Sequence, residues 1–551
     1  MKFSSLAFVP YLFSVIVLGL IAAPAVQAQD EDPPQVAVGE RLFLETRFAQ
    51  YFEAHSHGDA NRPLANGDPV MDSTITTDQP QPGPFAGQSM NCRACHLVDE
   101  QNTALGNRTY NDFARRSPVP SRIEDDHTVT LRNSPPLVNA SLARSTFLLH
   151  FDAEFPSKRA LVVGTMTGRN YGWLPGEETR ARAHIAHIIR DDDGTGDLAA
   201  DYGSTSYRKL FAADSSVPAE FRLPRAYRLN VDKATDDQIL NLIGTLVGAY
   251  MDSLIFSKDE KGNYNGSSFD SFLTKNKLPH RPATGESAVH YGDRLLGLLN
   301  KLTSPTFVTP ADGSFQNHTQ DFAFGQTELD GLKIFLRHPA HATASATELN
   351  QGAIGNCAAC HAPPNFTDFK FHNTGASQEE YDAVHGAGAF AQLTIPDYAT
   401  RRADPDTRLP ASHQHPFADG SFASIPDAQH QEYADLGLWN SFANPDRPLS
   451  QPAILRALTG GKPAPYAQWL PRTIALFKTP GLRDLTDSEP YLHTGGKDTL
   501  EDVISFYRSS SDLQRAGHLR NGAPELAGIA LQPQDIAPLA AFLKSLTEDY
   551  N

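Results

Sequence analysis

Cysteine is scarce in this 551-residue sequence: the chain contains four, and each belongs to one of two short motifs. The motifs read NCRACH at residues 91–96 and NCAACH at residues 356–361. Each pairs two cysteines with a histidine directly after them: Cys92, Cys95 and His96 in the first motif, and Cys357, Cys360 and His361 in the second. Because no cysteine is left over, the chemistry of the cysteines must be sought in these two motifs.

Basic charge and long apolar runs are scarce as well. The formal net charge is -17, which argues against nucleic acid as a partner, because binding nucleic acid requires a basic surface. An acidic surface suits a small basic protein partner, although a merely solvated surface explains the charge as well. Beyond the N-terminus no stretch of about 18 or more consecutive apolar residues occurs, so the sequence predicts no membrane span in the mature chain.

The N-terminus carries the one pronounced apolar run. Lys2 precedes an apolar stretch over residues 6–23, and the small residues Val26 and Ala28 follow at positions that precede a cleavage site. This pattern is typical of a secretory signal peptide. An uncleaved membrane anchor is the alternative, but the polar, proline-containing sequence QAQDEDPP favours cleavage after Ala28. We therefore expect a signal peptide at residues 1–28 and an exported protein, which in a Gram-negative cell means a periplasmic one.

A helix, a C-x-x-C-H motif, long loops and a closing helix are expected twice along the chain. The opening helices are predicted at residues 36–48 and 327–339, and the closing helices at residues 236–256 and 535–550. Such a weak internal repeat indicates two homologous domains, and the missing β-alternation predicts a mainly α fold. The predicted domains cover residues 29–310 and 321–551, with a linker in the proline- and glycine-bearing region 300–320.

Both cysteine motifs fit C-x-x-C-H, the attachment signature of c-type haem. Residues three apart share one face of a helical turn. Two thiols so placed can bond the two vinyl groups of a porphyrin, and the adjacent histidine can ligate the iron. Three alternatives compete. A zinc site needs both pairs close together, a thioredoxin-like site needs a βαβ context that this sequence lacks, and two short disulfides leave the histidines unexplained. The motifs therefore favour two covalently bound c-type haems.

Methionine is almost as scarce as cysteine, and its distribution limits the ligands of the second haem. The five methionines are Met1, Met71, Met90, Met166 and Met251. None follows the second motif, so a haem there cannot take from its own domain the methionine ligand common in electron-transfer cytochromes. Histidine, tyrosine, lysine or an open coordination site remain.

Four stretches make the sequence resemble the bacterial di-haem cytochrome c peroxidase family, including its MauG-type branch. They are GERLF before the first motif, LRNSPPLVNASL at residues 131–142, NCAACH with FTDFKFHNTG, and FKTPGLRDLTDSEPYLHTGGKDTLEDVISFY at residues 477–507. The resemblance implies two c-type cytochrome-like domains with long loops and one covalent haem each. It also implies that the haem at His96 reacts with peroxide and that the haem at His361 relays electrons.

The resemblance further implies that Tyr507 is the second axial ligand of the C-terminal haem. A methionine holds this position, in the helix after PY-x-H-x-G, in the peroxidase branch, and a tyrosine holds it in the MauG-type branch. Tyrosine is an accepted haem ligand, although a buried helix tyrosine with a satisfied hydroxyl is the alternative. An anionic phenolate would lower the potential of that haem relative to a methionine ligand.

The distal residues depart from the family pattern. The inter-haem tryptophan matches Phe151, and the distal glutamine and glutamate match Leu161 and Tyr171. Glu177 can serve as the catalytic distal acid if the loop is shifted, but it fits equally well as an acid at the start of the next helix. Trp173 is either a replacement for the inter-haem aromatic or a packing residue.

A calcium ion at the domain interface is also implied by the resemblance. Asn133 matches an asparagine whose side chain holds the ion, and Ser488 and Pro490 match backbone carbonyl positions. Oxygen ligands suit calcium, but a turn asparagine beside proline explains Asn133 as well. His127 lies where a loop histidine caps the N-terminal iron in resting peroxidases, but its spacing favours a surface loop.

The leading expectation is an exported di-haem oxidoreductase that reduces hydrogen peroxide with electrons from a small donor protein, such as a cytochrome c or a cupredoxin. One alternative is a MauG-like haem enzyme that oxidises a protein or organic substrate. The other is a non-enzymatic di-haem electron-transfer cytochrome.

Overall fold

The computed structural model describes residues 32–76, 79–82, 88–96, 116–125, 127–315, 318–486 and 488–549. The expected signal peptide, residues 1–28, lies outside them. The described chain is mainly helical, as predicted. Its strands are short and form two antiparallel pairs, β1 (Ser73–Thr76) with β2 (Gln79–Pro82) and β3 (Phe371–His372) with β4 (Phe477–Lys478). Among the helices in these ranges, none is long and apolar enough to cross a membrane.

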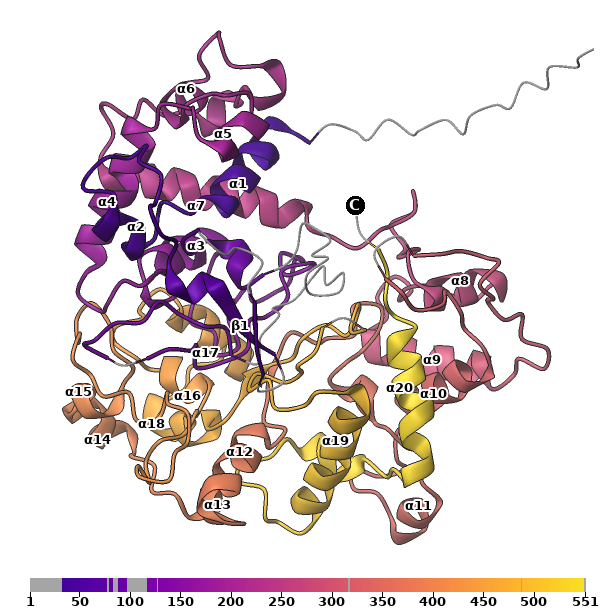
Figure 1. Cartoon of the computed structure of the whole chain (residues 1–551). Helices are drawn as coiled ribbons and strands as arrows, with labels where there is room; N and C mark the ends of the chain where they lie inside the picture. The colour runs from indigo at the N-terminus through magenta and orange to yellow at the C-terminus, as the bar shows by residue number, and fades with distance from the viewer. Residues whose placement is uncertain are drawn as a thin grey trace, which may run out of the picture. The chain divides into compact units, whose positions relative to one another are not determined.

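The first hydrophobic core is built by helices of the N-terminal half. Helix α1 (Pro34–Leu44) packs along α7 (Asp236–Ser253), as Figure 1 shows. Gly39 makes this close crossing possible, because a Cβ there would collide with the carbonyl group of Leu246. The core is completed by α2 (Gln50–His55), α3 (Lys158–Met166), α4 (Glu178–Asp191) and α6 (Tyr207–Ala212), and α5 (Asp197–Asp201) contacts α1.

The second core repeats this arrangement in the C-terminal half. Helix α10 (Gln326–Leu336) packs along α20 (Ile536–Lys544), and α19 (Leu500–Arg515) packs against α20 (Figure 1). A Cβ at Gly331 would collide with the carbonyl group of Pro538, so a glycine again lies where two helices cross. The opening and closing helices of the predicted repeat are therefore present in both halves.

Each of these four helices ends before its predicted end. Helix α10 shows one physical reason, because Pro339 disfavours helical conformation in the residue before it. The helix accordingly ends at Leu336, and Arg337 is extended.

The chain changes from the first core to the second between Tyr264 and Phe269. Helices α8 (Ser268–Lys275) and α9 (Ala288–Leu299) pack in the second core, although they precede the predicted linker. Part of the linker region packs there as well, since Val308 is buried in that core. The division into residues 29–310 and 321–551 stays a prediction.

Residues 373–476, between β3 and β4, form a segment with a third core. Pairing of β3 with β4 holds the two ends of this segment together. Trp439 and Phe442 are fully buried in its core. Its helices are α12 (Ala376–His385), α13 (Ala389–Gln392), α14 (Tyr398–Ala403), α15 (Pro405–Arg408), α16 (Leu438–Ser441), α17 (Gln451–Thr459) and α18 (Tyr466–Trp469); the remaining helix, α11 (Ala346–Gln351), precedes the second motif.

The segment also contacts the N-terminal half through buried charges. Arg132 donates to both carboxylate oxygens of Asp435, at 2.5 and 2.8 Å. Asp435 is buried, and so is Asp152, which lies 3.1 Å from Arg132. This contact brings the segment to the wall of the first site described below.

Candidate functional site

The first cysteine motif forms a turn that places its functional side chains on one side. Residues Cys92–Ala94 form a 3-10 turn, and the backbone N–H of His96 donates to the carbonyl oxygen of Cys92 at 3.1 Å. Asn91 caps the turn, because its side chain accepts from the turn backbone at 2.9 Å and donates to the carbonyl oxygen of Leu44 at 2.9 Å. The turn is thus fastened to the end of α1, and both cysteines and His96 line one cavity.

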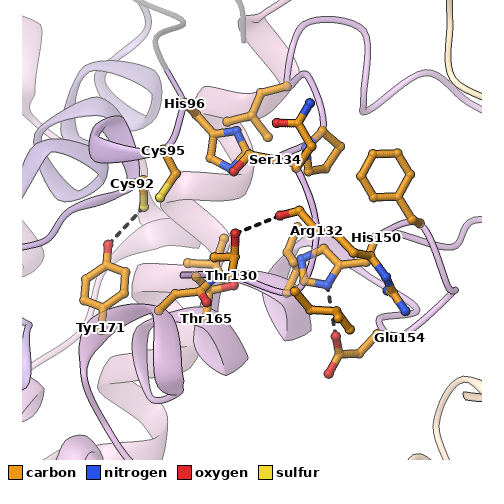
Figure 2. A pocket seen from close by; sticks show the side chains of 18 of the residues that line it. Cys92, Cys95, His96, Thr130, Arg132, Ser134, His150, Glu154, Thr165 and Tyr171 are labelled. Atoms are coloured by element: carbon orange, nitrogen blue, oxygen red, sulfur yellow. Dashed lines mark hydrogen bonds and ion pairs between the residues drawn. The ribbon is translucent and has the colours of Figure 1, made fainter. Parts of the chain in front are cut away.

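This first cavity has a volume of about 330 Å³. In Figure 2 the cysteines lie at its left, His96 at the top, and His150 with Glu154 at the right. The hydroxyl of Tyr171 lies 3.2 Å from the Cys92 sulfur. Burial raises the pKa of the Cys92 thiol to about 11, so this sulfur is not a reactive thiolate of the thioredoxin type.

His96 is held in the neutral form that a metal ligand requires. Burial lowers its pKa to about 4, and the neighbouring His150 lowers it further. The ring Nδ1 of His96 is buried and makes no hydrogen bond of standard geometry with the described residues; the nearest backbone acceptor is at Pro135.

The loop at residues 149–155 forms the side of the cavity that carries charge. His150, Asp152 and Glu154 all line the cavity, and their ligand atoms lie within 4.8 Å of one another. Two arginines neutralise Asp152, with Arg132 at 3.1 Å and Arg447 at 3.4 Å. Because these cations lie against Asp152, the cluster does not suit a metal cation and is better described as a hydrogen-bonded network.

The second motif forms the same kind of turn. Residues Cys357–Ala359 make a 3-10 turn, and the backbone N–H of His361 donates to the carbonyl oxygen of Cys357 at 2.8 Å. Asn356, in a left-handed conformation, fastens the turn by donating to the carbonyl oxygen of Glu525 at 2.8 Å. His361 places Nδ1 3.0 Å from the carbonyl oxygen of Phe366, an arrangement that orients a metal-binding histidine and leaves Nε2 available.

Tyr507 lies in the same cavity as this second motif. The cavity has a volume of about 240 Å³, and its wall includes His361, Tyr507 and both motif cysteines. No hydrogen bond joins the Tyr507 hydroxyl to any residue in the described part of the chain, so the alternative of a satisfied helix tyrosine is not what the structure has. Burial raises the pKa of Tyr507, and the two neighbouring thiols raise it further.

Lys478 gives the second cavity an unusual buried cation. Its side chain lines the cavity, and in the described ranges no carboxylate forms an ion pair with it. Burial lowers the pKa of Lys478 to about 7; the positive charge of Arg144 lowers it as well, and Asp152 opposes the shift. A lysine buried in this way would be stabilised by a bound anionic group in the cavity.

The two cavities meet at Phe151, which lines both. The backbone N–H of Lys478 donates to the carbonyl oxygen of Phe151 at 2.8 Å, and the ring of Phe151 lies 6.2 Å from that of His493. His493 stacks on Phe477 at 3.6 Å. The position that the sequence matched to the inter-haem aromatic is therefore a shared wall.

Asn133 also lines both cavities and joins the two halves of the chain. Its side-chain amide donates to the carbonyl oxygen of Pro490 at 2.6 Å, and its backbone N–H donates to that of His493 at 2.8 Å. Its side-chain oxygen is buried with no partner among the described residues. The structure thus brings together Asn133 and Pro490, two of the three residues that the sequence matched to a calcium site.

Glu177 does not line either cavity. Its carboxylate accepts from Arg122 at 2.9 Å and from the backbone N–H of Leu174 at 2.8 Å, directly before α4. Burial would raise the pKa of Glu177, but the hydrogen bond from Arg122 outweighs it and the pKa is lowered. The geometry fits a helix-start acid, and a distal role for Glu177 stays a prediction without support from its position.

Of the other residues that the sequence suggested, some line the first cavity and others do not. Leu161 and Tyr171, the positions matched to the distal glutamine and glutamate, both line the first cavity. Trp173 lines neither cavity and is fully buried in the first core, with its indole N–H 3.3 Å from the Phe48 carbonyl oxygen. The His127 side chain is 71% exposed, as expected of a surface loop.

Sequence reasoning missed His150, Glu154 and Arg447. The alternation of polar side chains in HFDAE, beside the position matched to the inter-haem aromatic, was an available signal for the first two. Arg447 had none, because it lies 295 positions from Asp152 in the chain and reaches the cavity only through the fold.

The competing interpretations of the cysteines lose support. All four cysteines are free, so neither pair forms a disulfide. The pairs line different cavities, and no cluster of metal-ligating groups in the described residues contains both. A four-cysteine zinc site is therefore not formed.

No family model matches the chain. Cytochrome-c peroxidase IdrP1 of Denitromonas iodatirespirans is 31% identical over 77 residues, which are 14% of this chain and 19% of that protein. Cytochrome-c peroxidase IdrP2 of Pseudomonas sp. strain SCT is 35% identical over 78 residues, again 14% and 19%. The match thus spans about a fifth of the length of these curated relatives.

Two solved structures are similar to the chain at low sequence identity. The diheme peroxidase BthA from Burkholderia thailandensis is 15% identical, with 94% of this chain and 86% of that chain covered and a TM-score of 0.40. A MauG-like protein associated with microbial copper homeostasis is 15% identical, with 94% and 91% covered and a TM-score of 0.42. Over the stretch that the curated relatives cover, the chain resembles cytochrome c peroxidases, as its motifs predict.

Proposed function

We propose that this chain is a di-haem c-type oxidoreductase that reacts with hydrogen peroxide at the first cavity and passes oxidising equivalents to the second. One observation carries the proposal: each C-x-x-C-H motif places both cysteines and the following histidine on the wall of a cavity of its own. A redox-active dithiol or a zinc site requires neither the histidines nor two separate cavities.

The residues present fit a c-type haem in each cavity. In the first, Cys92 and Cys95 would bond the porphyrin and His96 would ligate the iron. In the second, Cys357, Cys360 and His361 would do the same, and Tyr507 would be a further ligand of the iron, as the family resemblance implies. The hydroxyl of Tyr507 and the ammonium group of Lys478 each lack a protein partner in the described chain. A haem iron would be the partner of Tyr507, and a haem carboxylate would be the partner of Lys478.

The chemistry divides between the cofactor and the protein. A bound haem would supply the redox chemistry, a site for peroxide and the two electrons that reduce it. In the first cavity the protein supplies the neutral His96, which would hold the iron, and polar groups that handle protons. In the second cavity Tyr507 would hold the iron together with His361, so that peroxide would react in the first.

Asn133 and Pro490 would share one calcium ion at the boundary between the cavities. The unpartnered side-chain oxygen of Asn133 and the carbonyl oxygen of Pro490 are suitable ligands, since calcium takes only oxygen. A flip of the Asn133 amide, about 180°, would exchange the places of its nitrogen and oxygen and turn the oxygen toward the carbonyl of Pro490. Water would complete the coordination shell.

A second candidate function is MauG-like oxidation of a protein or organic substrate. Tyr507 favours it, because a phenolate stabilises oxidised iron and makes the second haem a poor acceptor for electrons from a high-potential donor. The partner is then a substrate protein, whereas a peroxidase takes electrons from a cytochrome c or a cupredoxin. In either case we propose export to the periplasm through the signal peptide at residues 1–28.

Expression with a c-type haem maturation system tests the proposal. We expect intact mass to report two covalent haems, and the variants Cys92→Ser/Cys95→Ser and Cys357→Ser/Cys360→Ser to retain one each. Peroxide added to the diferric protein then separates the functions. A high-valent spectrum that persists without a donor supports the MauG-like function, donor-dependent turnover supports the peroxidase, and an unchanged spectrum supports a plain electron carrier and contradicts the main proposal.

A further inference from the structure

The first cavity contains a histidine whose free ring nitrogen has the properties of a base. Nδ1 of His150 lies 3.0 Å from a carboxylate oxygen of Glu154, as the dashed line in Figure 2 marks. An ionised carboxylate only accepts hydrogen bonds, so Nδ1 carries the ring proton and Nε2 keeps its lone pair. No hydrogen bond from the described residues reaches Nε2, and the side chain lines the cavity.

The partner of His150 is itself fixed in place. The second carboxylate oxygen of Glu154 lies 3.1 Å from Arg447, and the backbone carbonyl of Glu154 accepts from the hydroxyl of Ser450 at 2.6 Å. Burial would raise the pKa of Glu154, but Arg447 and the hydrogen bond from His150 lower it below the ordinary value. Glu154 is therefore an oriented anion that faces Nδ1 of His150 and fixes the orientation of the ring.

The loop that carries this pair has an unusual backbone. His150 has a φ of 62° and Ala153 a φ of 65°, both in the left-handed region that residues with a Cβ seldom adopt. The backbone N–H of Leu149 donates to the carbonyl oxygen of Phe155 at 2.8 Å and closes the loop. Residues held in such conformations cluster at active sites, where the surrounding structure maintains them.

We propose that His150 is a catalytic acid–base residue of the first cavity and that Glu154 and Arg447 are its positioning residues. The proposal rests on the proposed function, in which peroxide binds in this cavity. His150 Nε2 takes the proton from the peroxide oxygen that binds and returns it to the other oxygen, which leaves as water when the O–O bond breaks. Both peroxide protons end on that water, and the two electrons come from the haem.

The other titratable groups around His150 do not share its hydrogen bond with Glu154. Asp152 is neutralised by Arg132 and Arg447 and does not compete for the same proton. His96, on the far side of the cavity in Figure 2, is held neutral by burial. Glu154 is thus the one anion in the described part of this cavity that hydrogen-bonds to His150.

Cyanide binding to the ferric holoprotein tests this proposal without turnover. Hydrogen cyanide must give up its proton on binding, so a distal base accelerates its association. We expect His150→Gln to slow both cyanide association and the first reaction with peroxide about 100-fold or more, the range of general acid–base catalysis. Haem content and the resting spectrum should stay unchanged, and imidazole should partly rescue His150→Gly.

Glu154→Gln distinguishes a positioning role from a structural one. Removing the negative charge should slow cyanide association about tenfold, while Glu154→Asp should restore most of the rate. His187→Gln is a matched control, because His187 also pairs with a carboxylate, Asp191 at 2.7 Å, but outside the cavity.

The possible results separate this proposal from the function on which it rests. Rates within twofold of wild type in His150→Gln would overturn it. So would a change of the first haem from six to five ligands, because His150 would then be a ligand. If wild-type protein binds cyanide but does not react with peroxide, the proposed function fails, and the cyanide rates of the variants still decide the role of His150.

Discussion

The two cavities share the same anchoring turn but differ in what faces it. The first is lined by charged and hydrogen-bonding groups that include Arg132, His150, Glu154 and Arg447. The second is lined mainly by apolar side chains from α19, α20 and the loop before α20, with Tyr507 facing the motif. Under the proposed function, both cavities hold the anchoring half of a haem site, and the opposite wall carries more charge in the first.

This difference shows how two similar turns can serve two tasks. The turns at Cys92–Ala94 and Cys357–Ala359 are specified by short local sequences. The opposite walls come from residues elsewhere in the chain. Charge stabilises proton transfer and departing water, whereas an apolar wall with a fixed ligand suits electron transfer with little rearrangement.

The largest effect is expected from removing each proximal histidine. His96→Gly should reduce the first reaction with peroxide by about 100-fold or more, as for other single catalytic groups. His361→Gly should leave that first reaction nearly intact and abolish the sharing of oxidising equivalents with the second haem. Stopped-flow spectroscopy of both variants measures this difference. Equal losses in the two variants would contradict the division of tasks.

A smaller effect is expected at Tyr507, where the change is in potential and not in reactivity. Tyr507→Met should raise the potential of the second haem by about 100 mV or more, a fraction of the roughly 0.8 V range that axial ligands control. The first haem should be unaffected. Redox titration with optical detection measures both, and Tyr491→Phe, a second tyrosine on the cavity wall, is the control. An unchanged spectrum in Tyr507→Met would exclude ligation.

The smallest effect concerns the proton on Lys478. Burial lowers its pKa to about 7, so the cation is present below that pH and is lost as the pH rises. A nearby cation favours the reduced haem, and the second potential should therefore fall with rising pH, by at most about 59 mV per unit. A haem carboxylate beside Lys478 would raise its pKa and move this change to higher pH.

Variants identify the source of that pH dependence. Lys478→Met should lower the second potential at acidic pH and remove the slope. Lys370→Met is a matched control, since the Lys370 side chain is 71% exposed and lies near the same strand pair. Persistence of the slope in Lys478→Met would assign it to another group.

The anchoring half of each site could be predicted from the sequence, and the distal half could not. Two cysteines, a histidine and an asparagine at the start of the turn lie within six consecutive residues, so local spacing is enough to identify them. Tyr507 required a family resemblance, because it reaches the second motif only through the packing of α19. The crossings at Gly39 and Gly331 were visible as a repeat of helices but not as contacts.

The first cavity shows why the polar alternation in HFDAE was not enough to predict its distal residues. His150 and Glu154 face the motif because two left-handed residues turn the loop, and no local pattern predicts those conformations. Glu177 is more conspicuous in the sequence, yet Arg122 and the start of α4 hold it elsewhere. A charged residue near a motif in sequence is therefore weak support for a role at that site.

The part of the first cavity's wall that residues 373–476 contribute affects the order in which this cavity folds during synthesis. Arg447 reaches Asp152 across 295 positions, and Asp435 reaches Arg132 across 303. Contacts between such distant residues form late, because chain closure must precede them, and N-terminal regions fold first during synthesis. The first cavity therefore stays open on one side until most of the chain has emerged. That interval is when a haem could be attached to Cys92 and Cys95, before Arg447 closes the cavity.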